Sequence, residues 1–155
     1  MKETFMQEAI RISIHKMREG HGGPFGAVIV KEDHVIGRGW NQVTSSNDPT
    51  AHAEIVAIRD ACRHVVGFRL DHCELYTSCE PCPMCLSAVY WARIGTVFYA
   101  STREDASQAG FDDEMIYQEL SRPPAQRKVV MRQLLREAAL EALEEWRGKT
   151  DKVLY

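Results

Sequence analysis

The sequence has no run of roughly 18 apolar residues, no internal repeat and no low-complexity segment. The first absence excludes a membrane-spanning helix of ordinary length. The residues from Met1 to Glu8 also lack the apolar segment of a secretory leader, so a cytoplasmic location is expected. An excess of positive charge is missing too, because the formal net charge is −3. Proteins that bind many phosphates usually carry a basic face, so a nucleic-acid substrate is disfavoured.

The chain is long enough for one domain with a single core, and we expect residues 1–155 to form one domain. It contains five cysteines, an odd number, and Cys79, Cys82 and Cys85 lie close together. In a reducing compartment such crowding indicates metal ligation rather than disulfide bonds. Cys62 and Cys73 stand apart from this group and are expected to be small core residues.

Helical and strand-like segments alternate along the chain. Apolar periodicity and turn residues predict helices at Glu3–Met17, after a start signal at Asp48-Pro49, at Pro81–Ala92 and at Asp112–Leu120, and a last helix ending at Gly148. Short apolar runs predict strands at Ala27–Val30, Val35–Ile36, Cys73–Thr77 and Gly95–Ala100, while Val129–Met131 is either a strand or the start of the last helix. This order predicts an α/β fold whose sheet is mixed, because it begins with a hairpin.

Two motifs carry the chemistry, and each lies at an expected helix start: His52-Ala53-Glu54 and Pro81-Cys82-Pro83-Met84-Cys85. Cys82 and Cys85 are three residues apart, so both sulfurs project from one face of a helix. The positive end of a helix favours the thiolate form that binds Zn²⁺. With His52 as a third ligand, one tetrahedral position is left for water, as in catalytic zinc sites.

Glu54 lies two residues after His52, where it can reach a zinc-bound water and move its protons without binding the metal. A His-x-Glu motif followed by Pro-Cys-x-x-Cys is the known signature of zinc deaminases. Either motif alone is weak, since a lone Cys-x-x-Cys also occurs in structural zinc sites and redox pairs. Cys79 is a competing ligand in principle, but the helix geometry favours Cys82 with Cys85.

The sequence resembles the cytidine deaminase-like superfamily and is most similar to bacterial guanine deaminases. The resemblance rests on five stretches: Gly22–Lys31, Thr44–Glu54, Tyr76–Cys85, Ala88–Arg93 and Ala109–Asp113. The zinc motifs are shared across the superfamily, whereas Gly110-Phe111-Asp112-Asp113 and the aromatic last residue, Tyr155, point to the guanine branch. The segment from Val129 to Trp146 is not matched residue by residue.

The resemblance implies a three-layer α/β/α sandwich with a five-stranded mixed sheet and one zinc ion per subunit. It implies hydrolysis of guanine to xanthine and ammonia, a step of purine metabolism, with Glu54 as the proton shuttle. It also implies a homodimer, in some members with the C-terminal segment exchanged between subunits.

Further site residues are implied by the same resemblance. Asn41 would hydrogen-bond the purine, although an Asn after a strand is also an ordinary turn residue. Asp113 would engage the polar edge of the base or assist proton transfer, yet Asp112 and Asp113 are both compatible with charges at a helix start. Sequence alone does not choose between these two aspartates, and the resemblance favours Asp113.

Aromatic residues are the remaining candidates for the substrate site. Three of them are expected to pack in the core rather than to line the pocket: Phe25, Trp91 and Phe111. Among these, Trp91 is the best candidate for the pocket, because it lies on the helix that carries the cysteines. Tyr155 would close the pocket from its own or the partner chain, although chain ends usually fray.

Two other functions are compatible with the motifs. One is deamination of a different base, such as cytosine, a related aminated ring or adenosine in tRNA, although the tRNA enzyme should show a basic face. The other is a zinc-stabilised binding module without catalysis. Glu54 argues against such a module, because a structural zinc site needs no free carboxylate and usually has a fourth protein ligand.

Overall fold

The computed structural model describes all 155 residues, and its sheet contains four strands in the order β2-β1-β3-β4. Strand β1 is antiparallel to both β2 and β3, whereas β3 and β4 are parallel. A parallel pair needs a crossover connection, and helix α4 supplies it. The strands are β1 (Gly26–Lys31), β2 (His34–Trp40), β3 (Cys73–Cys79) and β4 (Thr96–Ser101). The mixed sheet predicted from the hairpin is therefore confirmed.

The expectation of a fifth strand is wrong. Val129, Val130 and Met131 pair with no strand, and their exposed fractions are 75%, 72% and 64%. They do not begin the last helix either, because α7 spans Arg136–Gly148. The compact unit to which they belong contains no other strand, so their backbone groups find no ladder partner within it. A short apolar run therefore did not suffice to form a strand.

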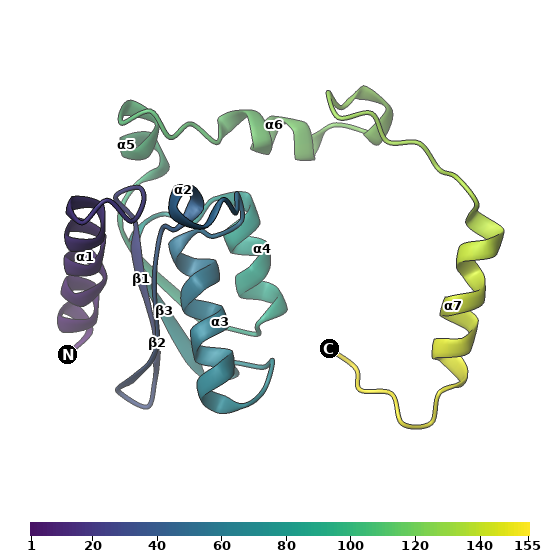
Figure 1. Cartoon of the computed structure of the whole chain (residues 1–155), viewed down its shortest axis with the longest axis horizontal. Helices are drawn as coiled ribbons and strands as arrows, with labels where there is room; N and C mark the ends of the chain where they lie inside the picture. The colour runs from purple at the N-terminus through teal and green to yellow at the C-terminus, as the bar shows by residue number, and fades with distance from the viewer. The chain divides into compact units, whose positions relative to one another are not determined.

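Helices cover both faces of the sheet, as the alternation of side chains along β1 requires. Val28 and Val30 form one cluster with Tyr76, against which Phe5 and Met6 of α1 pack. On the other face, Ala27, Ile29 and Leu75 pack with helix α3, and helix α4 joins the same cluster through Val89. Figure 1 shows α1 on one side of the sheet and α3 and α4 on the other. The helices are α1 (Lys2–Arg18), α2 (Val43–Ser46), α3 (Ala53–Val65), α4 (Pro83–Trp91) and α5 (Arg103–Gln108). The expected three-layer α/β/α arrangement is confirmed.

Helix α3 approaches β2 closely because two glycines on that strand have no side chain. A Cβ atom on Gly39 would overlap the carbonyl oxygen of Ala53, and one on Gly37 would lie 2.5 Å from the carbonyl oxygen of Ala57. Real Cβ atoms do not come that near to backbone atoms. The first turn of α3, which follows His52, is thereby set against the sheet.

The start of α3 differs from the prediction. We expected Asp48 to cap the helix with Pro49 in its first turn, but α3 begins at Ala53 and His52 is its N-cap residue. Asp48 instead accepts hydrogen bonds from the backbone N–H and the hydroxyl of Thr50, at 2.8 and 2.7 Å. Such local turns compete with helix initiation because they satisfy the same acceptor. Helix α4 likewise begins later than predicted, at Pro83, with Cys82 as N-cap.

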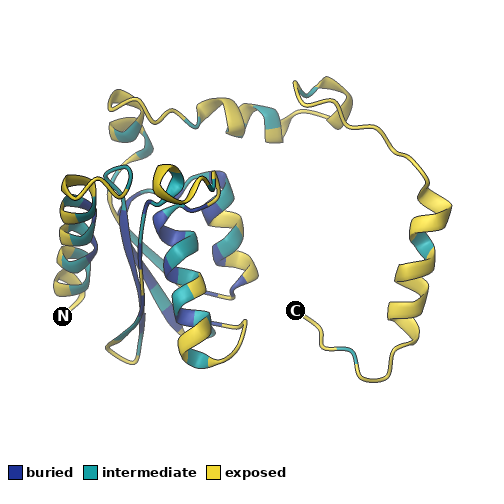
Figure 2. Cartoon of the chain, in the orientation of Figure 1, coloured by how far each residue is buried: buried dark blue, intermediate teal, exposed yellow.

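The chain divides into two compact units, Met1–Asp113 and Glu114–Tyr155. The second unit contains α6 (Glu114–Ser121), the short 3₁₀ helix η1 (Pro124–Gln126) and α7. No residue of α7 is buried, and Leu143 is 58% exposed (Figure 2). The expectation of a single domain stays a prediction.

None of the helices combines the length and the apolar character that crossing a bilayer requires. The cytoplasmic location expected from the sequence stays a prediction.

Candidate active site

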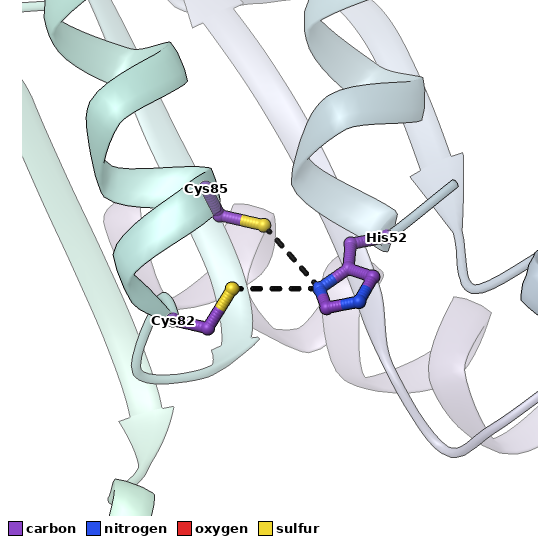
Figure 3. A group of neighbouring side chains, drawn as sticks. All are labelled: His52, Cys82 and Cys85. Atoms are coloured by element: carbon purple, nitrogen blue, oxygen red, sulfur yellow. Dashed lines mark hydrogen bonds between the residues drawn. The ribbon is translucent and has the colours of Figure 1, made fainter. Parts of the chain in front are cut away.

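Three potential metal ligands meet at the start of two helices. His52 and Cys82 are the N-cap residues of α3 and α4, and Cys85 lies in the first turn of α4. The Nδ1 atom of His52 is 3.5 Å from the sulfur of Cys82 and 3.5 Å from the sulfur of Cys85 (Figure 3). The three ligand atoms all lie within 4.8 Å of one another. These are the three residues that the motifs predicted.

This group has the dimensions of a zinc site. Zinc binds sulfur at about 2.3 Å and imidazole nitrogen at about 2.0 Å, so tetrahedral ligands of these two kinds are about 3.5 Å apart. Both N–S distances, 3.5 Å each, match that value. No fourth His, Cys, Asp or Glu belongs to the group. Cys79, the competing candidate, is directed elsewhere, with its sulfur 3.6 Å from the carbonyl oxygen of Thr102. The residues therefore fit a zinc ion held by three protein ligands.

The electrostatics of the cysteines also suit metal binding. The pKa of the Cys82 thiol is lowered to about 4. The largest cause is a hydrogen bond from the Cys85 thiol, and a hydrogen bond from His52 lowers it further. The same contact with Cys82, together with burial, raises the pKa of Cys85. The bond to Cys82 raises the pKa of His52 as well. Metal binding releases protons from such a pair, because both ligands must be thiolates.

Glu54 lies beside this group without belonging to it. Its side chain is buried, with 6% exposed, and burial raises the pKa of its carboxyl. The hydroxyl of Thr77 donates a hydrogen bond to Oε1 of Glu54 at 3.2 Å. Negative charge on Cys82 raises the same pKa further. A buried carboxyl with a raised pKa next to a metal site suits general acid–base chemistry.

Thr77 is a contact of this site that the sequence analysis did not single out. It is buried on β3, opposite Ala27 of β1. Alternation along the strand puts it on the same face as Cys73 and Leu75, which pack in the core under α3. A threonine in a row of apolar core positions was the available signal. Its hydroxyl needs a buried partner, and the partner is Glu54.

Asn41 lies at the same edge of the sheet as the metal ligands. It directly follows β2, and its neighbour Gln42 donates a backbone hydrogen bond to Ala51, the residue before His52, at 2.9 Å. Only 8% of Asn41 is exposed. Its Oδ1 accepts the backbone N–H groups of Gly23 and Val43, at 3.2 and 3.3 Å. Asn41 thus closes a turn, as expected if it is an ordinary turn residue. The segment that carries it is bonded to the residue before His52.

The two aspartates of the Gly-Phe-Asp-Asp segment differ in environment. Asp112 is exposed, whereas Asp113 is half-buried. Burial raises the pKa of the Asp113 carboxyl, the charge of Arg103 opposes this shift, and the charge on Cys82 adds to it. These surroundings favour Asp113 over Asp112 as a site residue.

The aromatic candidates are distributed unequally. The rings of Phe25 and Phe111 meet edge to face, with their centroids 4.8 Å apart. Trp91 ends α4 nine residues after Cys82, which is roughly 13 Å along the helix axis, and it is 65% exposed. Tyr155 belongs to the second unit and is 73% exposed. The single chain thus groups Phe25 with Phe111, while the pocket roles of Trp91 and Tyr155 stay predictions.

Comparison with known proteins identifies relatives along nearly the whole chain. Residues 1–101 match the family described as the cytidine and deoxycytidylate deaminase zinc-binding region. Guanine deaminase of Bacillus subtilis (strain 168) is 50% identical over 153 residues, which cover 99% of this chain and 98% of that protein. The X-ray structure of guanine deaminase from Bacillus subtilis matches with a TM-score of 0.96 at 50% identity, and the match covers 99% of this chain and 98% of that one. The similarity to the Bacillus subtilis enzyme therefore extends over both compact units of the chain, Met1–Asp113 and Glu114–Tyr155.

Deaminases with another substrate match over less of the chain. A tRNA-specific adenosine deaminase of Aquifex aeolicus (strain VF5) is 42% identical over 100 residues, which cover 64% of this chain and 66% of that protein. The rest of the chain lies outside that match, so this likeness is narrower than the one to the guanine deaminase.

Proposed function

This chain belongs to the cytidine and deoxycytidylate deaminase family, and from that premise we propose that it hydrolyses guanine to xanthine and ammonia. It is a zinc-dependent deaminase, and its zinc-binding group is the cluster of His52, Cys82 and Cys85. The observation that carries the choice of guanine is the 50% identity to a guanine deaminase over both units of the chain.

Zinc, when bound, lowers the pKa of a coordinated water to about 7 and so supplies hydroxide at neutral pH. Glu54 moves the protons. Its carboxylate takes a proton from the attacking water and delivers it to a ring nitrogen of guanine as the water oxygen adds to C2. The same carboxyl then takes the remaining hydroxyl proton and passes it to the amine, the C2–N bond breaks, and ammonia leaves. Water oxygen thereby becomes the new carbonyl oxygen of xanthine, and no redox partner is needed.

The hydrogen bond from Thr77 holds Oε1 of Glu54 in place, and proton transfer is assigned to the other carboxyl oxygen. Asp113 accepts from an N–H group on the polar edge of the base, since a carboxylate is an acceptor when ionised. Asn41 contributes a further hydrogen bond. Phe25 and Phe111 form an apolar wall, and Trp91 and Tyr155 complete the pocket in the assembled enzyme.

The substrate is tested by ammonia release from a panel of guanine, cytosine, adenosine, an aminated triazine and tRNA. We expect guanine to be turned over with the highest kcat/KM. Ammonia from cytosine or tRNA but not from guanine would overturn the substrate while leaving the deaminase class intact. Zinc bound with no ammonia from any member of the panel would instead support a binding module.

Asp113→Ala should lower kcat/KM for guanine by about 10- to 100-fold, the effect of losing one hydrogen bond to a charged group. The neighbouring Asp112→Ala is the matched control, because it removes the same group from an exposed position. Steady-state kinetics and thermal unfolding of both variants provide the comparison. If Asp112→Ala carries the loss and Asp113→Ala does not, the aspartates are assigned the wrong way round.

We further propose that the enzyme is a homodimer in which the C-terminal unit covers its partner. Helix α7 has no buried residue, although Leu143 and Trp146 are apolar. An isolated amphipathic helix of this length is marginal in water, so these side chains need a covering surface. Trp91 and Tyr90 on α4 are also large, apolar and exposed, at 65% and 74%. A second copy of the chain offers such a surface to both.

Deletion of Lys152–Tyr155 should reduce activity, because the proposed pocket loses Tyr155. Mixing this variant with Glu54→Gln tests exchange between subunits. Each homodimer alone is impaired, but a mixed dimer has one intact Glu54 facing a complete tail from its partner. After unfolding and refolding the variants together, we expect activity to return, and light scattering should report the mass of a dimer. Mixed dimers without activity would place each tail on its own subunit.

A further inference from the structure

The side-chain amide of Asn41 has a fixed orientation. Its Oδ1 accepts hydrogen bonds from the backbone N–H groups of Gly23 at 3.2 Å and Val43 at 3.3 Å. A backbone N–H only donates, so the atom that faces both of them must be the oxygen. The amide nitrogen Nδ2 therefore points the other way. A rotation that exchanged the two atoms would set an NH₂ group against two donors.

Gly22 allows this arrangement. A Cβ atom on Gly22 would overlap the backbone carbonyl of Asn41 and would lie 2.8 Å from its Oδ1. Hydrogen bonds fix the loop on both sides of Gly22. The hydroxyl of Ser45 donates to the carbonyl oxygen of His21 at 2.6 Å. The backbone N–H of Asn41 donates to the carbonyl oxygen of Phe25 at 3.0 Å. A side chain at Gly22 would therefore push the loop away and lengthen the bond from the Gly23 N–H.

The nitrogen of the same amide is available to a ligand. Nδ2 of Asn41 makes no hydrogen bond within the protein, and the structure contains no fully buried side-chain nitrogen or oxygen without a partner. Nδ2 is thus reachable from outside although only 8% of the residue is exposed. The backbone bond from Gln42 to Ala51 joins the segment that carries Asn41 to the residue before His52.

We propose that Gly22 and Gly23 lock Asn41 as an obligate hydrogen-bond donor, so that the enzyme binds its base through an acceptor atom and rejects a ring that presents a donor there. Gly22 is a positioning residue in this scheme, and Asn41 determines specificity. The proposal rests on the proposed function in one respect, namely that Asn41 faces the base. What it adds is that Asn41 donates the hydrogen bond to the base, and that the loop at Gly22 and Gly23 fixes Asn41 as the donor. Because the donor is held before the base arrives, a mismatched ring leaves a buried polar group unpaired, which discriminates strongly.

Asn41→Asp is the decisive variant. The carboxylate still accepts from the Gly23 and Val43 N–H groups, but its second oxygen cannot donate. We expect KM for guanine to rise about tenfold or more, with a smaller change in kcat. Wild-type KM in Asn41→Asp would overturn the proposal, since the contact would then not need a donor.

Gly22→Ala tests the lock, with Gly95→Ala as the matched control because a Cβ there meets open space. We expect Gly22→Ala to raise KM and Gly95→Ala to leave it unchanged. Amide hydrogen exchange of Gly23, followed by NMR without substrate, should accelerate in Gly22→Ala only. This second readout does not depend on the substrate, so it tests the lock even if guanine proves inert. Unchanged exchange and unchanged KM in a folded Gly22→Ala would show that the loop does not hold Asn41.

Discussion

Glu54→Gln should lower kcat for guanine by about 10³- to 10⁴-fold, the upper part of the range for a general acid–base group. Gln keeps the shape of the side chain, and its amide oxygen can still accept the hydrogen bond from Thr77. It cannot take a proton from water or return one to the departing amine. Zinc content should therefore stay at one ion per subunit while turnover is lost. The variant should fold normally, because an uncharged amide is not penalised by burial as a carboxylate is.

The measurement is kcat from ammonia release, together with zinc by atomic absorption and thermal unfolding on the same samples. Glu3→Gln is the matched control, since it makes the same chemical change at an exposed position in the first turn of α1. Full activity in Glu54→Gln would remove this carboxyl from the mechanism. Lost zinc would show that Glu54 supports the metal rather than the proton transfer.

Cys82→Ala has the second large expected effect, on the metal itself. Only three protein ligands form the group, so the variant leaves zinc with two. Changes to residues that merely support a ligand cost about 10- to 100-fold in metal affinity, and removal of a ligand should exceed about 100-fold. We expect the purified variant to contain little zinc and to release no measurable ammonia. Its thermal unfolding temperature should fall too, because the zinc bound to the native state no longer stabilises it.

Cys79→Ala is the control for that experiment. Cys79 is the nearest other thiol in the sequence, yet its sulfur contacts the carbonyl oxygen of Thr102 instead of the metal group. We expect this variant to retain zinc at the wild-type stoichiometry. Undiminished zinc in Cys82→Ala, or zinc lost from Cys79→Ala, would show that the set of ligands is wrong.

The two cysteine ligands were predictable because their geometry is local, whereas His52, 30 residues before Cys82, was identified from its motif. The three-residue spacing brings Cys82 and Cys85 to one face at the helix start, although the helix begins at Pro83 and not at Pro81 as predicted. The predicted start of α3 was wrong, and the reason is also local. Asp48 can serve a turn or a helix cap, and the turn with Thr50 prevailed. Local competition of this sort cannot be settled from residue types alone.

The contacts that tune the site were not predictable in the same way. Thr77 meets Glu54 across a separation of 23 residues, and Gly23 meets Asn41 across 18. Both contacts depend on the register of the sheet, since Thr77 is opposite Ala27 and the turn at Asn41 follows β2. The fifth strand that the family resemblance implied is absent from the sheet. Val129–Met131 has the composition of a strand, but whether it pairs depends on a partner elsewhere in the chain.

By itself, the sequence determined the α/β class, because helix and strand periodicity act over a few neighbouring residues. It also identified the trio that binds zinc and the carboxyl beside it, because two motifs of known chemistry occur together. Tertiary structure alone decided that the side-chain oxygen of Asn41 is occupied, what anchors Glu54, how closely α3 lies on Gly39, and which aspartate is the less exposed. Those features arise where distant segments meet, and the free energy of such a meeting depends on packing and register that no short stretch of chain contains.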